Sequence, residues 1–306
     1  MSVSTALTPS LRRRLPLLLL AAPGVAVLLA FQYFPLLGNV IAFKHYLPFL
    51  GIWDSEWVGW ENFGVIINGD PRFLSALANT LIITLVQVVV VFPIPIALAI
   101  ALTSLANERI KRVVQSVLYL PHFLSWVIVV GIFQQFLGGS GMINNFLRAH
   151  GHDPFQIIGN PDLFIPLLTS QLIWKDAGWA TILFLAVLSQ IDTQLYEASV
   201  VDGASRMRQL WHITLPALRS VAILLLILRL GDALSVGFEQ IILQQPAVGL
   251  DASDVLDTYV YNNGIVGGNW SEAAAVGLVK GVVSVLLVLG ANKVAHMFGE
   301  DGLYRK

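Results

Sequence analysis

The sequence predicts an all-α membrane protein with six transmembrane helices. Only 12% of its 306 residues are charged, 56% are hydrophobic, and the mean hydropathy is +0.73. Soluble domains carry about twice this share of charged residues, so an ordinary soluble enzyme is excluded. A net charge of −1 leaves no cationic surplus for nucleic acid, and the high apolar content excludes a disordered chain. Because the chain has no cysteine, it has no disulfides and no thiolate metal site.

Long apolar segments predict where the six helices lie, because about 20 apolar residues cross a bilayer core as a helix. Three segments are free of charge, and three contain single charges or pairs. The expected spans are 15–43, 73–107, 113–147, 165–188, 217–238 and 273–298. Prolines within them predict kinks, which a bundle tolerates when neighbouring groups satisfy the freed backbone. We expect the first segment to remain as a helix, since it is about twice as long as the apolar core of a signal sequence.

Lys and Arg residues predict the orientation of these helices. With the N-terminus in the cytoplasm, twelve of the eighteen basic residues fall in cytoplasmic segments. The other six are Lys44, Arg72 and Arg148 in external loops and Lys175, Arg229 and Lys280 within spans. This bias satisfies the positive-inside rule at every loop and predicts that both termini are cytoplasmic.

The same assignment divides the chain into five parts. They are a cytoplasmic tail (1–14), a first transmembrane helix (15–44), an external loop (45–72), a five-helix core (73–298) and a second cytoplasmic tail (299–306).

The chain has no sequence motif for nucleotide binding or catalysis. A G-x-x-x-x-G-K-[ST] loop, an H-E-x-x-H element and a G-x-S-x-G element are all absent from the sequence. The glycine-rich segments 138–141 and 267–268 lack the lysine of a phosphate-binding loop and fall in external loops. We therefore expect a transport subunit with no catalytic residue, metal or cofactor of its own.

The cytoplasmic loop between the fourth and fifth spans, residues 192–216, is expected to dock on a partner. Gly203 separates two short helices, because glycine accepts the positive φ that a helix C-terminus often requires. Apolar residues at helical spacing give the second helix a stripe. Pro216 then opens the fifth span, where proline in a first helical turn costs little.

At this loop the chain resembles the permease subunits of binding-protein-dependent ABC importers. Their motif is E-A-A, three residues, G, nine residues and I-x-L-P, and this chain matches each spacing with serine as its one departure. The residues concerned are Glu197, Ala198, Ser199, Asp202, Gly203, Ala204, Ile213, Leu215 and Pro216. The segments 42–46, 57–63, 202–204 and 254–261 are similar to the branch that imports oligosaccharides of the aldouronate type.

The resemblance implies a type I importer fold like that of the maltose importer, with the 194–216 loop as a coupling helix. It also implies a second homologous permease, two cytoplasmic ATPase subunits that hold ATP and Mg, and an external solute-binding protein. The solute would be a sugar, in this branch an oligosaccharide, and the location would be the bacterial cytoplasmic membrane. Glu197 would contact the ATPase, although an ordinary solvated carboxylate on a helix face is the alternative.

Polar and aromatic residues at bilayer depth are candidates for the solute path. Ionised groups there are costly and usually face protein or water. Sugars offer hydroxyls to polar side chains and C–H faces to aromatic rings. The candidates are Gln171, Trp174, Lys175, Asp176, Trp179, Arg229 and Asp232.

Structural roles remain open for the same charged groups. Lys175 and Asp176 could form an ion pair packed against tryptophan. Arg229 and Asp232 stand at i and i+3 and could neutralise each other. Lys280 is expected to meet a carboxylate or carbonyl on another helix, and His122 is expected to pack rather than to relay protons.

External carboxylates form a further group, in or beside the connection between the fifth and sixth spans. They are Glu239, Asp251, Asp254, Asp257 and Glu272. They are expected either to form an acidic rim for a binding protein or to be solvated individually.

Two other functions are compatible with a six-span protein. An ion- or proton-coupled secondary carrier could use the intramembrane charges as relay groups, but such carriers usually have internal repeats and more spans. A membrane-embedded enzyme or assembly factor is the third alternative, and no paired catalytic constellation supports it. Dependence of uptake on ATP, with no effect of a protonophore, would distinguish the importer from the carrier.

Overall fold

The computed structural model describes residues 9–297, 299 and 302–304. Residues 1–8 of the expected N-terminal tail, and 298, 300, 301, 305 and 306 near the C-terminus, lie outside the described residues. Within the described part, six helical runs are long and apolar enough to cross a membrane, which confirms the expected number. Their bounds are Pro16–Phe43, Pro71–Thr103, Trp126–Ala149, Pro161–Leu188, Arg206–Gly231 and Trp270–Met297.

The first span and the segment after it come from the N-terminal quarter. The span consists of α1 (Pro9–Leu28), a π-helical turn (Leu29–Tyr33), α2 (Phe34–Leu36) and a 3-10 helix (Leu37–Phe43). The next segment contains β1 (Lys44–His45), α3 (Gly51–Asp54), β2 (Glu56–Trp57), a 3-10 turn (Glu61–Phe63) and α4 (Gly64–Ile67). The two strands pair antiparallel, with Lys44 opposite Trp57.

The middle of the chain supplies the second, third and fourth spans. Their elements are α5 (Pro71–Val86), a π turn (Gln87–Val91), α6 (Pro93–Thr103), α7 (Glu108–Tyr119), a 3-10 turn (Leu120–Phe123), α8 (Trp126–Leu137), α9 (Met142–Ala149), a 3-10 turn (Pro161–Leu163) and α10 (Phe164–Leu188).

The remainder supplies the loop at residues 192–216, called the motif loop below, and the last two spans. Its elements are α11 (Thr193–Val201), α12 (Arg206–Gln209), a π turn (Leu210–Thr214), α13 (Leu215–Gly231), α14 (Phe238–Ile242), α15 (Gln245–Val248), α16 (Leu250–Ser253), α17 (Leu256–Val260), a π turn (Tyr261–Val266) and α18 (Trp270–Met297).

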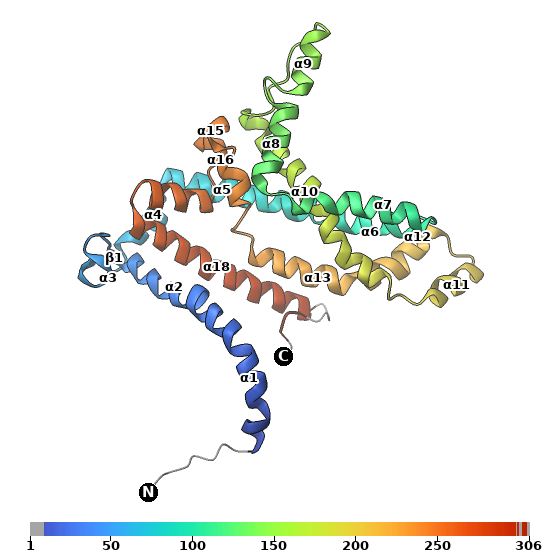
Figure 1. Cartoon of the computed structure of the whole chain (residues 1–306), viewed down its shortest axis with the longest axis horizontal. Coiled ribbons are helices and arrows are strands. Elements are labelled where there is room, and N and C mark those ends of the chain that lie inside the picture. The colour runs from blue at the N-terminus through green and yellow to red at the C-terminus, as the bar shows by residue number, and fades with distance from the viewer. Residues whose placement is uncertain (1–8, 298, 300–301, 305–306) are drawn as a thin grey trace.

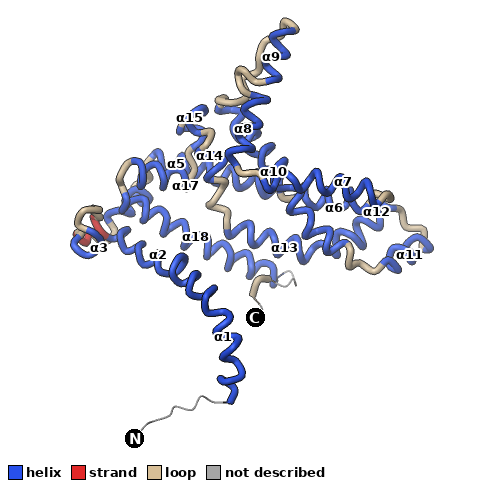
Figure 2. Tube along the Cα trace, in the orientation of Figure 1, coloured by secondary structure: helices blue, strands red, loops and turns tan. Residues whose placement is uncertain are grey.

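Helices α5, α6, α7, α10, α13 and α18 run along the long axis of the molecule (Figure 1). The motif loop, with α11 and α12, lies at one end, and β1, α3 and α4 lie at the other. Figure 2 shows that most of the loops and the two short strands lie outside this bundle. Two helical arms leave it on opposite sides, α1 and the pair α8 and α9 (Figure 1).

In the described part of the chain, three of the four π-helical turns end two residues before a proline. They end at Tyr33, Val91 and Thr214, ahead of Pro35, Pro93 and Pro216. A proline ring in a helix clashes with the carbonyl four residues earlier, and widening that turn relieves the clash. At these three prolines the helix is therefore widened locally, whereas Pro23 lies inside α1 without a π turn.

The expected third span, 113–147, is not one helix. It is divided into α7, a corner at residues 120–125, and the arm formed by α8 and α9. Pro121 lacks a backbone N–H, and the Oγ of Ser125 accepts a hydrogen bond from the N–H of Ile128 at 3.4 Å, which begins a new helix. α7 packs on α10, whereas the arm turns away from the bundle.

Polar residues on one face of α5 hold an irregular part of the chain between α13 and α17. The amide of Asn79 donates to the carbonyls of Asp251 and Asp254, at 3.3 and 3.0 Å. The hydroxyl of Thr80 accepts from the N–H of Leu256 at 2.9 Å, and that of Thr84 donates to the carbonyl of Ala233. Non-helical backbone is tolerated at membrane depth when protein satisfies it in this way.

Candidate functional site

The motif loop forms two helices joined at Gly203. The carboxylate of Asp192 caps α11 by accepting a hydrogen bond from the N–H of Gln194 at 2.9 Å. α11 ends at Val201, and Gly203 has a φ of +75°, as the sequence predicted. Ser205 then caps α12. The chain can reverse here because glycine has no Cβ to disfavour the left-handed region.

Side-chain hydrogen bonds fasten the two helices of the loop together. The hydroxyl of Ser199 accepts from Nε2 of Gln209 at 2.8 Å and donates to the carbonyl of Tyr196 at 2.7 Å. The hydroxyls of Tyr196 and Thr214 lie 3.0 Å apart. Ser199 is the residue that departs from the family motif, and its hydroxyl makes contacts that alanine could not make.

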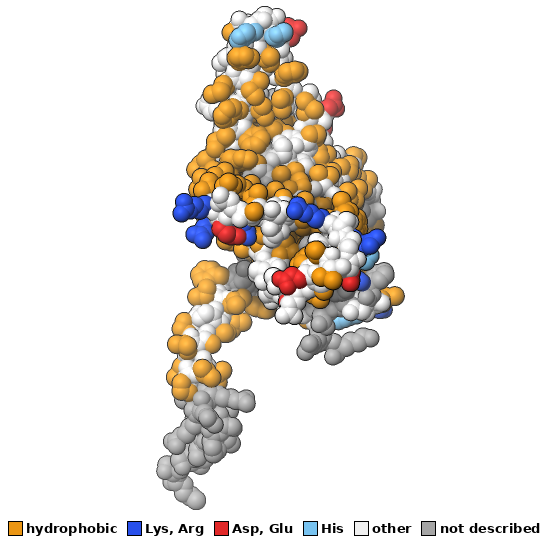
Figure 3. Space-filling view, turned by 90° about the vertical axis from the view of Figure 1, so that its right-hand side faces the viewer, with side chains coloured by type: hydrophobic (Ala, Val, Ile, Leu, Met, Phe, Trp, Pro, Cys, Tyr) orange, Lys and Arg blue, Asp and Glu red, His pale blue; other side chains and the backbone are white. Residues whose placement is uncertain are grey.

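The outer face of the loop is exposed. Glu197, Ala198 and Asp202 are accessible, and the side chain of Val201 is 88% exposed. Ile213 and Leu215 are half-buried where the loop joins α13. Figure 3 looks at this end of the molecule and shows Lys and Arg side chains distributed around it. The loop therefore offers a mixed apolar and acidic surface within a basic surround.

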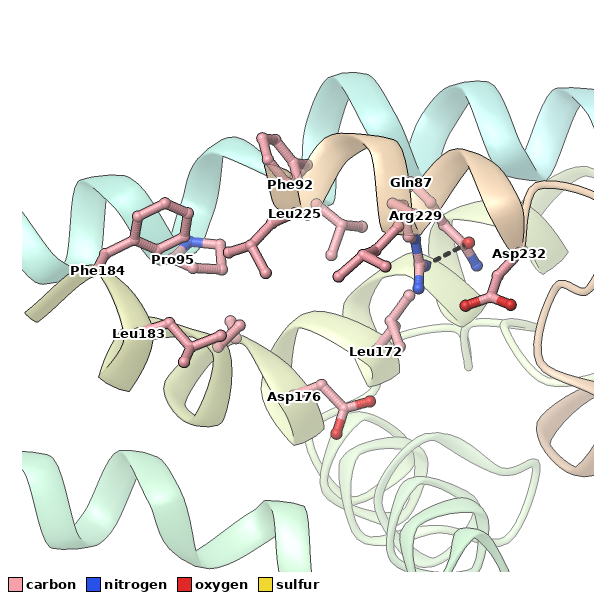
Figure 4. Close-up of a pocket in the computed structure, with 14 residues that line it drawn as sticks. Gln87, Phe92, Pro95, Leu172, Asp176, Leu183, Phe184, Leu225, Arg229 and Asp232 are labelled. Atoms are coloured by element: carbon pink, nitrogen blue, oxygen red, sulfur yellow. Dashed lines mark hydrogen bonds between the residues drawn. The ribbon is translucent and has the colours of Figure 1, made fainter. Parts of the chain in front are cut away.

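A second candidate site is a cavity of about 310 Å³ between the π turn Gln87–Val91, α6, α10 and α13. Its wall is largely apolar, and the charged residues that line it are Asp176, Arg229 and Asp232 (Figure 4). Nη2 of Arg229 donates to Oε1 of Gln87 at 2.5 Å. The cavity thus presents two carboxylates, a guanidinium and an amide, all able to bond to hydroxyl groups.

The expected pairing of Arg229 with Asp232 does not form. α13 ends at Gly231, so Asp232 has left the helix and no longer shares a face with Arg229. No ion pair within 4.0 Å joins these two described residues, and the guanidinium turns to Gln87 instead. Both charged groups consequently remain on the cavity wall (Figure 4).

Gln171 lies elsewhere, in a cluster of buried amides. It has no exposed surface. Its Oε1 accepts from Gln240 and Gln244, at 2.8 and 3.1 Å, and its Nε2 donates to Oε1 of Gln244 at 3.0 Å. The cluster joins α10 to α14, which gives Gln171 a structural position rather than one on the cavity wall.

Lys175 and Asp176 do not pair with each other. Nζ of Lys175 donates to the carbonyls of His122 and Leu124, at 2.6 and 2.7 Å. Oδ1 of Asp176 lies 2.8 Å from Nδ1 of His122. Both residues therefore bind the corner at 120–125.

The two tryptophans of α10 contact different elements. Trp174 meets Phe133 of α8 edge to face, with ring centroids 6.0 Å apart. Trp179 stacks on His122 at 4.6 Å, with the ring planes 2° apart. Neither ring lies among the described residues that line the cavity.

Two acidic residues of the external connection are neutralised internally. Asp257 pairs with Lys280 of α18, as expected for a lysine in need of a partner on another helix. Asp254 is buried and lies 3.5 Å from Arg72 at the start of α5. A continuous acidic rim is therefore not formed, because these charges face the protein.

Sequence reasoning did not select Gln87 or His122 for these sites. Gln87 and Thr84 are the polar residues of an otherwise apolar run, 81–102, and that signal could have identified them. The role of His122 depends on α10, which lies 54 residues further along the chain. No local pattern indicates that contact.

The bundle and its exposed motif loop define a permease subunit of a membrane transporter. The chain belongs to the family described as "binding-protein-dependent transport system inner membrane component", whose model matches residues 63–298. It is 44% identical to protein LplB of Bacillus subtilis over 296 residues, which cover 96% of this chain and 93% of LplB. It is also 44% identical to YteP of the same organism, a polygalacturonan/rhamnogalacturonan transport system permease protein, over 94% of this chain and 90% of YteP.

A solved structure is similar over nearly the whole chain. It is a chain of a bacterial alginate ABC transporter in complex with an alginate pentasaccharide-bound periplasmic protein. The TM-score is 0.87 and the identity 35%, and the match covers 96% of this chain and 98% of that one. The predictions of an all-α importer permease fold and of a transport subunit rather than an enzyme are confirmed. The secondary-carrier alternative gains no support.

Proposed function

We propose that this chain is the sugar-importing permease of an ATP-driven importer, which forms half of the path and couples to a separate ATPase through the 194–216 loop. The observation that carries the proposal is the loop itself. The two helices that carry the motif meet at Gly203, whose φ is +75°. Glu197, Ala198 and Val201 are exposed to solvent. An exposed apolar and acidic surface of this kind suits a protein partner.

The energy source in this proposal is the partner. ATP and Mg are held by two cytoplasmic ATPase subunits, and closure of that pair moves the loop and the helices joined to it. Glu197 supplies a charge contact to the ATPase surface. The family description supports an external solute-binding protein, which would deliver the solute to the opposite end of the bundle.

Two helical arms support pairing with a second, homologous permease. The most apolar 18 residues of the first span include no buried residue, so none of the described residues covers that part of the span. Apolar side chains are also exposed on the other arm, among them Val127, Phe136 and Phe146. A second subunit would cover surfaces that a single chain leaves to lipid.

The proposed location is the bacterial cytoplasmic membrane, with both termini in the cytoplasm. Basic residues around the loop end of the molecule support that orientation, because cytoplasmic segments of membrane proteins are enriched in Lys and Arg. They include Arg109, Lys111, Arg112, Arg206 and Arg208.

The proposed solute is an oligosaccharide, and Asp176, Arg229 and Asp232 are its candidate contacts in this chain. Relatives named for polygalacturonan/rhamnogalacturonan and for arabinooligosaccharides support this solute class. The cavity supports it as well, because carboxylates accept and guanidinium groups donate hydrogen bonds to sugar hydroxyls.

Copurification followed by transport tests the proposal. A tagged chain is expected to bring down an ATPase, a second permease and, in the presence of solute, a binding protein. The reconstituted complex should then take up labelled galacturonan, arabinan or alginate oligosaccharides only with ATP inside. A protonophore should have no effect, whereas uptake that needs a proton gradient and no ATP would refute the proposal.

The lack of cysteine allows a direct check of the docking face. Val201→Cys gives a single reactive site on the exposed face of the loop, and Phe155→Cys gives a control site that is also exposed, in the segment after α9. The first is expected to be protected from a thiol reagent when the ATPase is bound. Equal labelling of the Val201 variant with and without the ATPase, or protection of the Phe155 variant alone, would argue against docking at the loop.

A further inference from the structure

The corner between α7 and α8 is clamped by residues of α10. Lys175 binds two of its carbonyl groups, Asp176 binds the His122 ring, and Trp179 stacks on that ring. Residues 175, 176 and 179 share one face of a helix, since i, i+3 and i+4 positions are neighbours. The direction in which α8 leaves the bundle therefore depends on α10.

The contacts that hold the corner differ in how easily they can be broken. Lys175 is only 7% exposed, and its ammonium also lies 5.5 Å from the centre of the Trp126 ring, the first residue of α8. A buried ammonium bound to two carbonyl groups is costly to move. The His122 ring, in contrast, is attached through one hydrogen bond and one stacked face, so it is the part of the corner that can yield.

Asp176 connects the clamp to the cavity. It lines the cavity together with Arg229 and Asp232 (Figure 4). Its Oδ1 bonds to His122, which is not among the described residues that line the cavity. A carboxylate only accepts, so Nδ1 of His122 carries the proton of this bond. No described residue bonds to the second oxygen of Asp176, and its side chain is 36% exposed. One carboxylate oxygen is committed to the corner, and the other is available to a solute hydroxyl.

We infer that Asp176 reports occupancy of the cavity to the α7–α8 corner through His122. This rests on the proposed function, because it takes the cavity to be part of the solute path. A hydroxyl that donates to the free oxygen draws the carboxylate into the cavity and weakens its bond to His122. The corner is then held by Lys175 and by the stacking of Trp179 on His122, and the α8–α9 arm can change its direction. His122 is thus a positioning residue for turnover and has no contact with the solute.

Two variants test the two contacts of Asp176 separately, the one with His122 and the one with solute. His122→Phe retains a ring that can stack on Trp179 and removes Nδ1. The corner is then released whether or not the cavity is occupied, so it no longer responds to solute. In the reconstituted importer, with the oligosaccharide that gives uptake, the maximal rate should therefore fall at least about tenfold. The half-saturating concentration should stay within about twofold of the original, because this ring lies outside the cavity.

Asp176→Asn should give the opposite pattern. The amide oxygen can still accept from His122, but the charge offered to the solute is lost. The half-saturating concentration should rise about tenfold, with the maximal rate largely retained. His122→Gln, which supplies an N–H donor, should recover part of the lost rate, and assembly with the ATPase should be normal in every variant.

The outcomes distinguish this inference from the proposed function. Absence of ATP-dependent uptake by the unaltered complex would refute the proposed function. If the unaltered complex transports but His122→Phe changes only the half-saturating concentration, or nothing, the connection is refuted and the function stands. If Asp176→Asn leaves half-saturation unchanged, the carboxylate does not bind solute and the connection is likewise refuted. A variant that fails to assemble is replaced by one that removes the same group, His122→Leu or Asp176→Gln, under the same criteria.

Discussion

Gly178 of α10 packs directly against the carbonyl group of Leu118 of α7, so closely that a methyl group at Gly178 would overlap it. This contact allows α7 to lie tightly on α10 just before the corner. We expect Gly178→Ala to destabilise the protein by about 1–3 kcal/mol, because backbone would have to move to admit one carbon. Thermal unfolding of the detergent-solubilised importer measures the loss.

Gly277 is the matched control for that substitution. It lies in α18 with open space around the position of a Cβ. Gly277→Ala should therefore leave the unfolding temperature unchanged or raise it slightly, since alanine is the better helix former. Equal losses at both glycines would contradict the packing argument.

Gly203→Val should uncouple ATP hydrolysis from uptake while the subunit still inserts. No heavy atom lies within 4 Å of a Cβ built at Gly203, so the effect arises from its φ of +75°. A β-branched residue disfavours that conformation and would displace the exposed loop. Gly203→Asn is the control, because asparagine tolerates the left-handed region. Normal uptake by the valine variant would count against docking through this turn.

The ion pair between Lys280 and Asp257 should behave as a coupled unit. Their side chains are 15% and 24% exposed, so removal of one partner leaves a poorly hydrated charge. We expect Lys280→Met alone to cost about 3 kcal/mol. The double variant Lys280→Met with Asp257→Leu should recover most of that loss, as judged by thermal unfolding. A double variant no more stable than the single one would exclude this coupling.

Tyr259 should titrate well above the ordinary range of a tyrosine. Burial raises the pKa of Tyr259 to about 12, and the nearby carboxylates of Asp70 and Glu272 act in the same direction. The folded state therefore binds this proton more tightly than the unfolded state. The resulting stability is fully present below about pH 10 and is lost as the pH rises toward 12.

Near-ultraviolet titration of the protein and of Tyr259→Phe isolates this group. The difference between the two curves should have its midpoint at about pH 12 rather than at the ordinary value of about 10. A midpoint at the ordinary value would mean that the phenol is open to water.

The features that sequence predicted are those set by neighbours along the chain. Six apolar runs define six spans whatever the packing, and the turn at Gly203 depends on one residue that accepts a positive φ. The same reasoning failed at residues 113–147, because the run is free of charge throughout while its corner depends on Lys175. Hydropathy measures how readily a segment enters an apolar environment. It does not indicate the direction in which a helix leaves a corner.

Charge pairing was the least predictable property. Arg229 and Asp232 have the spacing of a helical pair, yet α13 ends between them and the arginine bonds to Gln87. Asp254 and Asp257 resemble solvated loop residues, but their partners Arg72 and Lys280 come from two different helices. Such contacts join residues that are distant in sequence, so they become visible only when the helices are assembled.

The hydrogen bonds that join Asn79, Thr80 and Thr84 to the segment 233–256 have a mechanical consequence. α5 and residues 233–256 cannot separate without exposing several unsatisfied backbone groups to an apolar medium. They must travel as one rigid body, whichever way the protein opens. Spin labels placed on these two parts should keep a constant separation throughout the transport cycle, while distances to the rest of the bundle change.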